Sequence, residues 1–139
     1  MAIKVYWQDA AHSIIRFDYR EQWTWQEFIN AARASWAMAD TSTHRVDLIA
    51  NLTDGQTIPP TGAFGQINAI TREGGRHWEI AVIVGVNPVI KTLVRAFKQI
   101  YREAGHKYLV ADTIEDALTL IAEHRAQAET ITEAQPPNR

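Results

Sequence analysis

The sequence predicts an α/β domain, with a mixed, mostly parallel sheet of about five strands and flanking helices in the order ββαβαβαβα. The strongest observation is the apolar run 80–84, which meets Gly85 and then a helix beginning at Asn87 and Pro88. A continuous apolar run is typical of a strand buried on both faces. Weaker strand-then-helix units lie on either side of it, and each crossover between parallel strands should be right-handed.

The first part of the chain predicts a hairpin and a capped helix. Residues 3–7 and 13–18 form two short strand patterns, separated by a loop of hairpin length, so the two strands should pair antiparallel. Thr24 and Glu27 then have the spacing of a capping box. Apolar residues at helical spacing follow and predict a helix to about residue 39.

The middle of the chain predicts a second strand and helix. Residues 46–52 form a strand pattern that only Asp47 interrupts, and a polar loop, 53–60, follows it. The next helix is weak because Gly62 and Gly65 occur in its first turns.

The last third predicts two more helices around a short strand. A helix runs from Pro88 to about Tyr101, residues 107–111 form a strand, and Thr113 caps the final helix. Large apolar residues disappear from about residue 127. We therefore expect one domain over residues 1–126 and a frayed tail over 127–139.

Composition excludes several classes of function. The chain has 139 residues, 46% of them apolar, and a net charge of only −2, which excludes the basic footprint of a nucleic-acid-binding protein. There are no cysteines for disulfides or thiolate zinc sites, and the five histidines lack metal-ligand spacing, so we expect no metal. Neither a secretory signal nor a run of ~18 apolar residues occurs, which predicts a cytoplasmic protein with no membrane span.

One segment resembles a phosphate-binding loop. It runs over 85–92 and ends in Lys91 and Thr92, but Ile90 stands where the second glycine is required and Pro88 has no amide hydrogen to donate. A structural interpretation accounts for the segment, with Asn87 as the helix cap and Pro88 as the first helical residue. We therefore expect no nucleotide and no other cofactor.

The five tryptophans could serve packing or contact. Trp25 and Trp36 follow the stripe of the first helix and are predicted to lie in the core. Trp7, Trp23 and Trp78 lie near strand ends, where packing and a partner surface are equally compatible with an amphipathic ring. A basic row, Arg95, Lys98 and Arg102, predicts a solvated helix face, with an acidic partner as the alternative.

The order of elements and several short phrases resemble the STAS superfamily. The phrases are 47–52 leading to a helix near residues 60–62, the strand 80–85, and Asp-Thr-Ile-Glu-Asp-Ala-Leu over 112–118. More narrowly, the chain is similar to the SpoIIAA-like branch of bacterial proteins over residues 3 to about 125. The resemblance implies a non-enzymatic interaction module.

Anti-sigma factor antagonists of that superfamily carry a phosphorylated Ser or Thr at the start of the second helix. When Gly62 is aligned with the motif glycine, the phosphoacceptor falls on Pro60, which has no hydroxyl, and the preceding Asp falls on Pro59. Only Thr61, one place later, could replace it. This chain therefore departs from the motif that is phosphorylated in those antagonists, which puts the same phosphorylation switch in doubt here.

The predicted site lies beyond the carboxyl ends of the parallel strands, where ligands settle in open sheets. The polar residues expected at this edge are Asn51, Thr53, Asp54, Thr61, Asn87 and Asp112. Local capping and turn formation are the alternative explanation for most of them.

We expect a STAS-like regulatory module that binds a protein partner or a small ligand at this edge, and its size is compatible with a C2 homodimer. The alternative is a small hydrolase or transferase that uses Asp54 and Asp112. In a dry pocket those two carboxylates could not both stay ionised and unpaired.

Overall fold

The computed structural model describes residues 2–20, 22–54, 58–59 and 62–134, with side chains to residue 130. It is an α/β fold built on one five-stranded sheet, as the sequence predicts. The strands are β1 (Ile3–Trp7), β2 (Ile14–Tyr19), β3 (Asp47–Asn51), β4 (Ala81–Val84) and β5 (Tyr108–Ala111). The helices are α1 (Trp25–Ala39), α2 (Ala63–Gly74), η1 (Gly75–His77), α3 (Pro88–Ile100), α4 (Arg102–Gly105) and α5 (Ile114–Ala134).

The local signals read from the sequence form where they were expected. The Thr24 hydroxyl accepts a hydrogen bond from the Glu27 amide, and Glu27 reaches back to the Thr24 amide, which completes the capping box of α1. The Asn87 side chain caps α3, and Pro88 occupies its first turn. The N-cap of α2 is Gly62 in the left-handed region, with φ of 75°, and no side chain caps this helix.

The strands lie in the sheet in the same order as in the chain. β1 pairs antiparallel with β2, and β2 through β5 are mutually parallel. Asn51 lies beside Val84, and Val84 lies beside Ala111. The carboxyl ends of β3, β4 and β5 therefore share one edge, as the predicted site requires.

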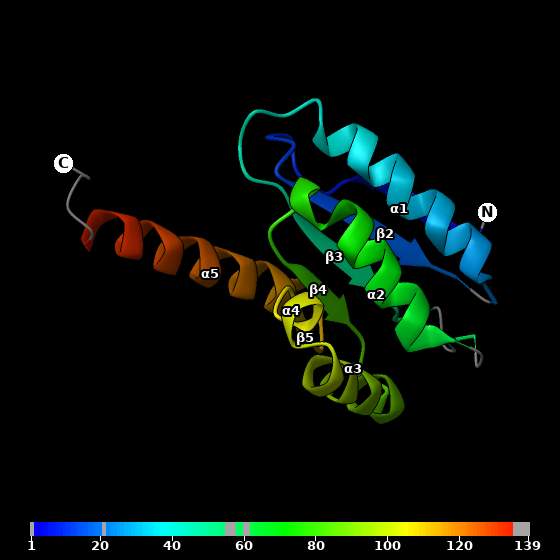
Figure 1. The fold of residues 1–139 in the computed structure, drawn as a ribbon. Coiled ribbons are helices and arrows are strands. Elements are labelled where there is room, and N and C mark those ends of the chain that lie inside the picture. The colour runs from blue at the N-terminus through cyan, green and yellow to red at the C-terminus, as the bar shows by residue number, and fades with distance from the viewer. Residues whose placement is uncertain (1, 21, 55–57, 60–61, 135–139) are drawn as a thin grey trace.

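This strand order determines which helices cover which face. Each parallel strand is followed by its immediate neighbour, and crossovers of one hand then place every intervening helix on the same face of the sheet. Figure 1 shows α1 and α2 lying side by side over the sheet, whereas α5 leaves β5 in another direction. The only helix that packs on the opposite face, among the described residues, is α5, which contacts β3, β4 and β5.

Strand alternation divides the core into two layers. The larger layer lies between the sheet and α1, α2 and α3, and it contains Phe17, Leu48 and Ala81. The smaller layer lies beneath α5 and contains Ile49 and Val82. The sequence leaves open whether Trp23 and Trp78 pack in the core or contact a partner. Both are 6% exposed and belong to the larger layer.

A buried carboxylate anchors α5 to the sheet. Asp47 is fully buried, and Arg45 Nε lies 3.0 Å and Arg125 Nε 2.7 Å from its Oδ2. The Ile80 amide donates to its Oδ1 at 3.1 Å, and Arg125 also donates to the Ser13 carbonyl at 2.9 Å. The residue that interrupts the apolar run 46–52 is thus the point where α5, β3 and β4 are joined.

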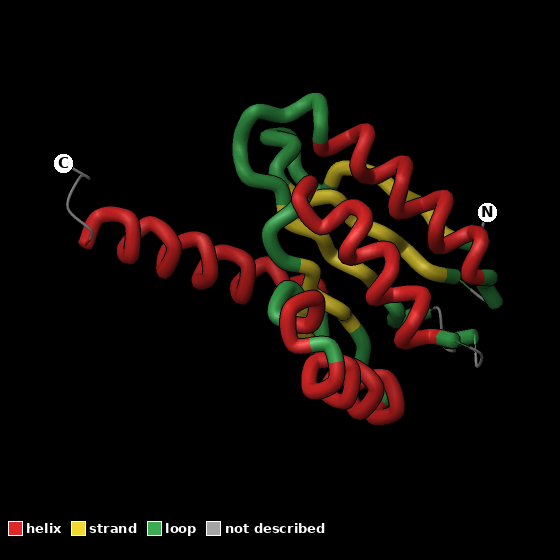
Figure 2. Tube along the Cα trace, viewed as in Figure 1, coloured by secondary structure: helices red, strands yellow, loops and turns green. Residues whose placement is uncertain are grey.

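Beyond this anchor, α5 extends away from the sheet (Figure 2). It continues to Ala134, past residue 127, where the sequence predicts the start of a frayed tail. Across the described ranges, no helix combines the length and apolar character needed to span a membrane.

Candidate functional site

The polar residues predicted at the strand tips are held by local contacts. The Asn51 side chain is 9% exposed; its Oδ1 accepts from the Thr53 amide and hydroxyl, and its Nδ2 donates to Asp18 at 3.0 Å. Asn87 Oδ1 accepts from the Val89 amide at 2.9 Å. These two amides therefore act as a turn former and a helix cap, the alternative that the sequence left open.

The remaining tip residues are exposed or lie outside the described residues. Asp112 pairs with Lys91, and both Asp54 and Asp112 are exposed. Asp54 lies in the loop three residues beyond the end of β3, and Asp112 directly follows β5, with β4 between these two strands. Thr61 and Pro60 lie outside the described residues. The carboxylate pair of the alternative enzyme therefore does not share a dry pocket.

The order of the strands gives a physical reason why these residues do not share a pocket. Ligand crevices in open parallel sheets form where the strand order reverses and neighbouring crossovers pass to opposite faces. The described strands run in chain order without such a reversal.

A polar network surrounds Asp18 on the sheet face that carries Ile49. The Asp18 carboxylate accepts from Tyr6 Oη at 2.6 Å, Arg16 Nε at 2.7 Å and Asn51 Nδ2 at 3.0 Å. Burial alone raises the pKa of Asp18, but these hydrogen bonds and the Arg16 charge outweigh it and hold the pKa below the ordinary value of 3.8. The ionised form of Asp18 is thus favoured in the folded protein.

The Asp18 network predicts loss of stability in acid. Because the pKa of Asp18 is lower in the folded than in the unfolded chain, its stabilising effect is complete above the unfolded pKa and disappears as pH falls through the folded pKa. We expect the free energy of unfolding of Asp18→Asn to change less than that of the wild type between pH values of about 5 and 2. Urea denaturation across this range measures the difference. Asp54→Asn, which removes an exposed carboxylate, is the control. If the free energy of unfolding of Asp18→Asn changed with pH as steeply as that of the wild type, the prediction would be wrong.

An apolar cavity lies on the opposite face of the sheet. A cavity of about 110 Å³ lies between the sheet and helices α1, α2 and α3, and its lining includes four of the five tryptophans. The tryptophans are Trp23, Trp25, Trp36 and Trp78. Tyr19, Leu52 and Ile90 also line it, and these residues lie at the carboxyl edge of the sheet or just beyond it. Trp78, Ala81 and Tyr108, at the amino ends of β4 and β5, line it as well, so the cavity extends along this face of the sheet from one edge to the other.

The aromatic walls are packed edge to face. The rings of Trp23 and Trp25 have centroids 5.0 Å apart and are inclined at 84°, and Trp25 meets Phe28 at 5.5 Å and 89°. The indole nitrogens of Trp23 and Trp25 are buried and have no hydrogen-bond acceptor among the described residues. Edge-to-face geometry offers such donors only the weak N–H···π contact. This wall is thus apolar and poor in hydrogen bonds.

Small side chains opposite the large rings leave the void. Ala32 and Ser35 on α1 and Ala50 and Ala81 on the sheet all line the cavity. The Ser35 hydroxyl donates to the Ala32 carbonyl at 2.6 Å, so its polar atom is satisfied within the helix.

A second, smaller cavity continues the first beneath α2. It measures about 60 Å³ and includes Phe64, Leu93 and Phe97 in its lining. Ile58, Ile67, Ile83, Val94 and Tyr108 line both cavities. Both cavities have lining residues on α2, the helix whose first turns the sequence predicts to be weak.

Sequence patterns identify part of this lining but not the void. Trp25 and Trp36 follow the helical stripe, and both line the cavity as the core prediction implies. The sequence signal that could have indicated the cavity was the combination of four tryptophans with alanines at core positions. Comparison of the chain with protein-family models, with curated proteins and with solved structures finds no match.

Proposed function

We propose that this protein is a non-enzymatic binding module that takes a small apolar ligand into the tryptophan-lined cavity. The observation that carries the proposal is a void of about 110 Å³ inside a core that is otherwise well buried. An engineered apolar cavity of similar size, ~150 Å³, stays dry and binds benzene. A bound apolar ligand would recover the contacts that the empty cavity lacks.

The chemistry of the lining favours binding over turnover. Among the described residues that line the cavity, the tyrosines are the groups that titrate, and none is a carboxylate, a histidine or a cationic side chain. Such walls offer neither a general acid and base nor an activated nucleophile. The motifs that resemble the SpoIIAA-like branch support a STAS-like regulatory role for this module in a bacterial cytoplasm.

Thermal unfolding with compact apolar probes tests the proposal. Benzene, toluene and indole should each raise the melting temperature in a concentration-dependent way, because a ligand that binds only the folded state stabilises it by mass action. Glycerol at the same concentrations is the polar comparison. Absence of any shift with all three apolar probes, up to their solubility limits, would overturn the proposed function.

A further inference from the structure

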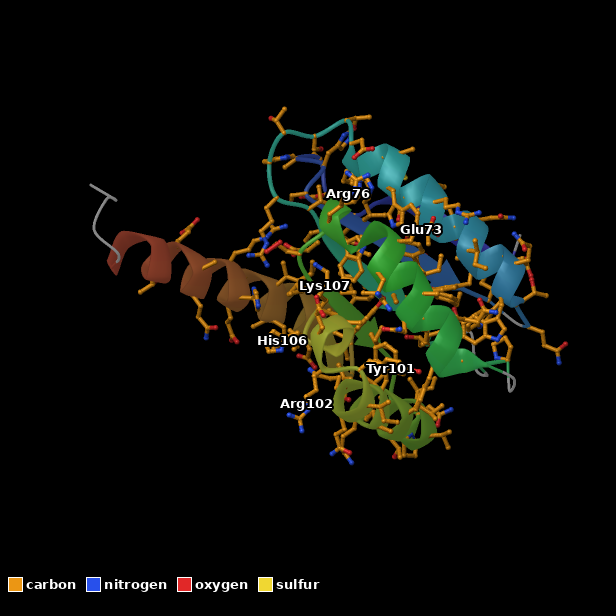
Figure 3. All side chains as sticks on the ribbon, in the orientation of Figure 1. Glu73, Arg76, Tyr101, Arg102, His106 and Lys107 are labelled. Atoms are coloured by element: carbon orange, nitrogen blue, oxygen red, sulfur yellow. The ribbon has the colours of Figure 1, made fainter. Side chains whose placement is uncertain are left out.

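A basic groove lies outside the cavities, between the end of α2 and the short helix α4. It measures about 600 Å³, and its charged lining residues are Arg72, Arg76, Arg102, Glu103 and Lys107. Figure 3 shows Glu73 and Arg76 beside the end of α2, and Tyr101, Arg102, His106 and Lys107 around α4. Four cationic side chains against one carboxylate give this groove a positive potential.

The arginines of the groove have no anionic partner in the described part of the chain. Arg72, Arg76 and Arg102 are exposed and form no ion pair there. Glu73 is directed to α1, where it pairs with Arg33 at 3.3 Å. Arg72 lies in the last turn of α2, where its charge also offsets the helix dipole, but this effect does not neutralise the groove.

Lys107 connects the groove to Trp78, which lines the larger cavity. Its ammonium donates to the Trp78 carbonyl at 2.6 Å and lies 4.5 Å from the centroid of the Trp78 ring. Burial lowers the pKa of Lys107. An anion in the groove would therefore meet a partly desolvated cation whose side chain rests on the cavity lining.

Two residues in contact link the lining of the groove to the lining of the cavities. Thr71 lines the groove, and its hydroxyl lies 2.6 Å from the hydroxyl of Tyr108. Tyr108 in turn lines both cavities. The Thr71 hydroxyl also donates to the Ile67 carbonyl at 2.7 Å. The hydrogen-bonded pair Thr71 and Tyr108 thus contacts both an apolar interior and a cationic groove.

We propose that the natural ligand is an amphiphile with a linear apolar chain and an anionic head, of the class of an alkyl carboxylate. The chain occupies the two adjoining cavities beneath α2, and the carboxylate lies in the basic groove against Arg72, Arg76, Arg102 and Lys107. The hydrogen bond between Thr71 and Tyr108 is the barrier that opens when the ligand passes between them. This inference rests on the proposed function, because it requires that the cavity accept an apolar group.

Octanoate and 1-octanol test the inference because they share a chain and differ in the head. Intrinsic tryptophan fluorescence reports binding directly, since four tryptophans line the cavity. At low ionic strength octanoate should bind about tenfold more tightly than 1-octanol, and this advantage should shrink at about 0.5 M salt as the charges are screened.

A triple variant, Arg72→Gln, Arg76→Gln and Arg102→Gln, should weaken octanoate binding by about tenfold and leave 1-octanol unchanged, because each exposed charge contributes modestly. Arg95→Gln removes an exposed charge of α3 outside the groove lining and should leave both affinities unchanged. Equal binding of both probes, or a triple variant that keeps the octanoate preference, overturns this inference alone. Failure of both probes and of benzene, toluene and indole overturns the proposed function as well.

Discussion

Replacing Asp47 by alanine should destabilise the protein by about 3–5 kcal/mol, because removing one member of a buried ion pair leaves its partners uncompensated. Asp47 is fully buried between Arg45 and Arg125, and it also accepts from the Ile80 amide. Urea denaturation measures the loss. Hydrogen exchange should show early loss of protection in α5, since Arg125 is the residue of that helix that contacts Asp47.

Asp112→Ala is the matched control for this prediction. It also removes an aspartate from an ion pair, but Asp112 and Lys91 have side chains that are 55% and 35% exposed. Exposed pairs contribute no more than about 1 kcal/mol. A loss for Asp47→Ala as small as that for Asp112→Ala would show that the buried network does not stabilise the fold.

Ala32→Leu should stabilise the free protein by about 1 kcal/mol and weaken the binding of apolar probes by more than about tenfold. Ala32 is 6% exposed and lines the larger cavity, so the added carbon atoms would occupy space that is empty now. Filling a void restores dispersion contacts without displacing the backbone. Chemical denaturation measures stability, and tryptophan fluorescence measures the affinity for toluene.

Ala37→Leu adds the same atoms to an exposed position of the same helix. It should leave the toluene affinity unchanged and alter stability by no more than about 0.5 kcal/mol. If Ala32→Leu were destabilising and still bound toluene like the wild type, the cavity would be neither the space that the leucine fills nor the ligand site.

Much of the fold could be predicted from local patterns. The apolar run 80–84, the capping box at Thr24 and the Asn87-Pro88 cap each describe interactions within a few residues, and each forms as expected. The length of α5 was not predictable in the same way. Its last turns lack a large apolar stripe, and the helix nevertheless continues to Ala134.

The predicted site at the carboxyl edge of the sheet stays a prediction, and the cavity was not predicted from the sequence. Polar residues do lie at the carboxyl edge, but Asn51 and Asn87 are engaged in turn and cap, and Asp112 is paired with Lys91. The void lies between the sheet and the helices, where alanines of α1, β3 and β4 line the same cavity as large aromatic rings. No periodic pattern reveals a volume that is missing between elements distant in the chain.

The sequence by itself determined the succession of strands and helices, the caps and the face that each segment buries, because these depend on residues close together in the chain. Only the tertiary structure decided that the strands lie in chain order and so place α1, α2 and α3 on one face. It also decided that Asp47 pairs with Arg45 and Arg125. The position of Thr71 and Tyr108 between a basic groove and an apolar cavity is likewise a tertiary feature. Residue 47 and residue 125 meet only once α5 packs on the sheet. The charge balance and free volume of an interior are sums over such distant contacts, which is why they become visible only in three dimensions.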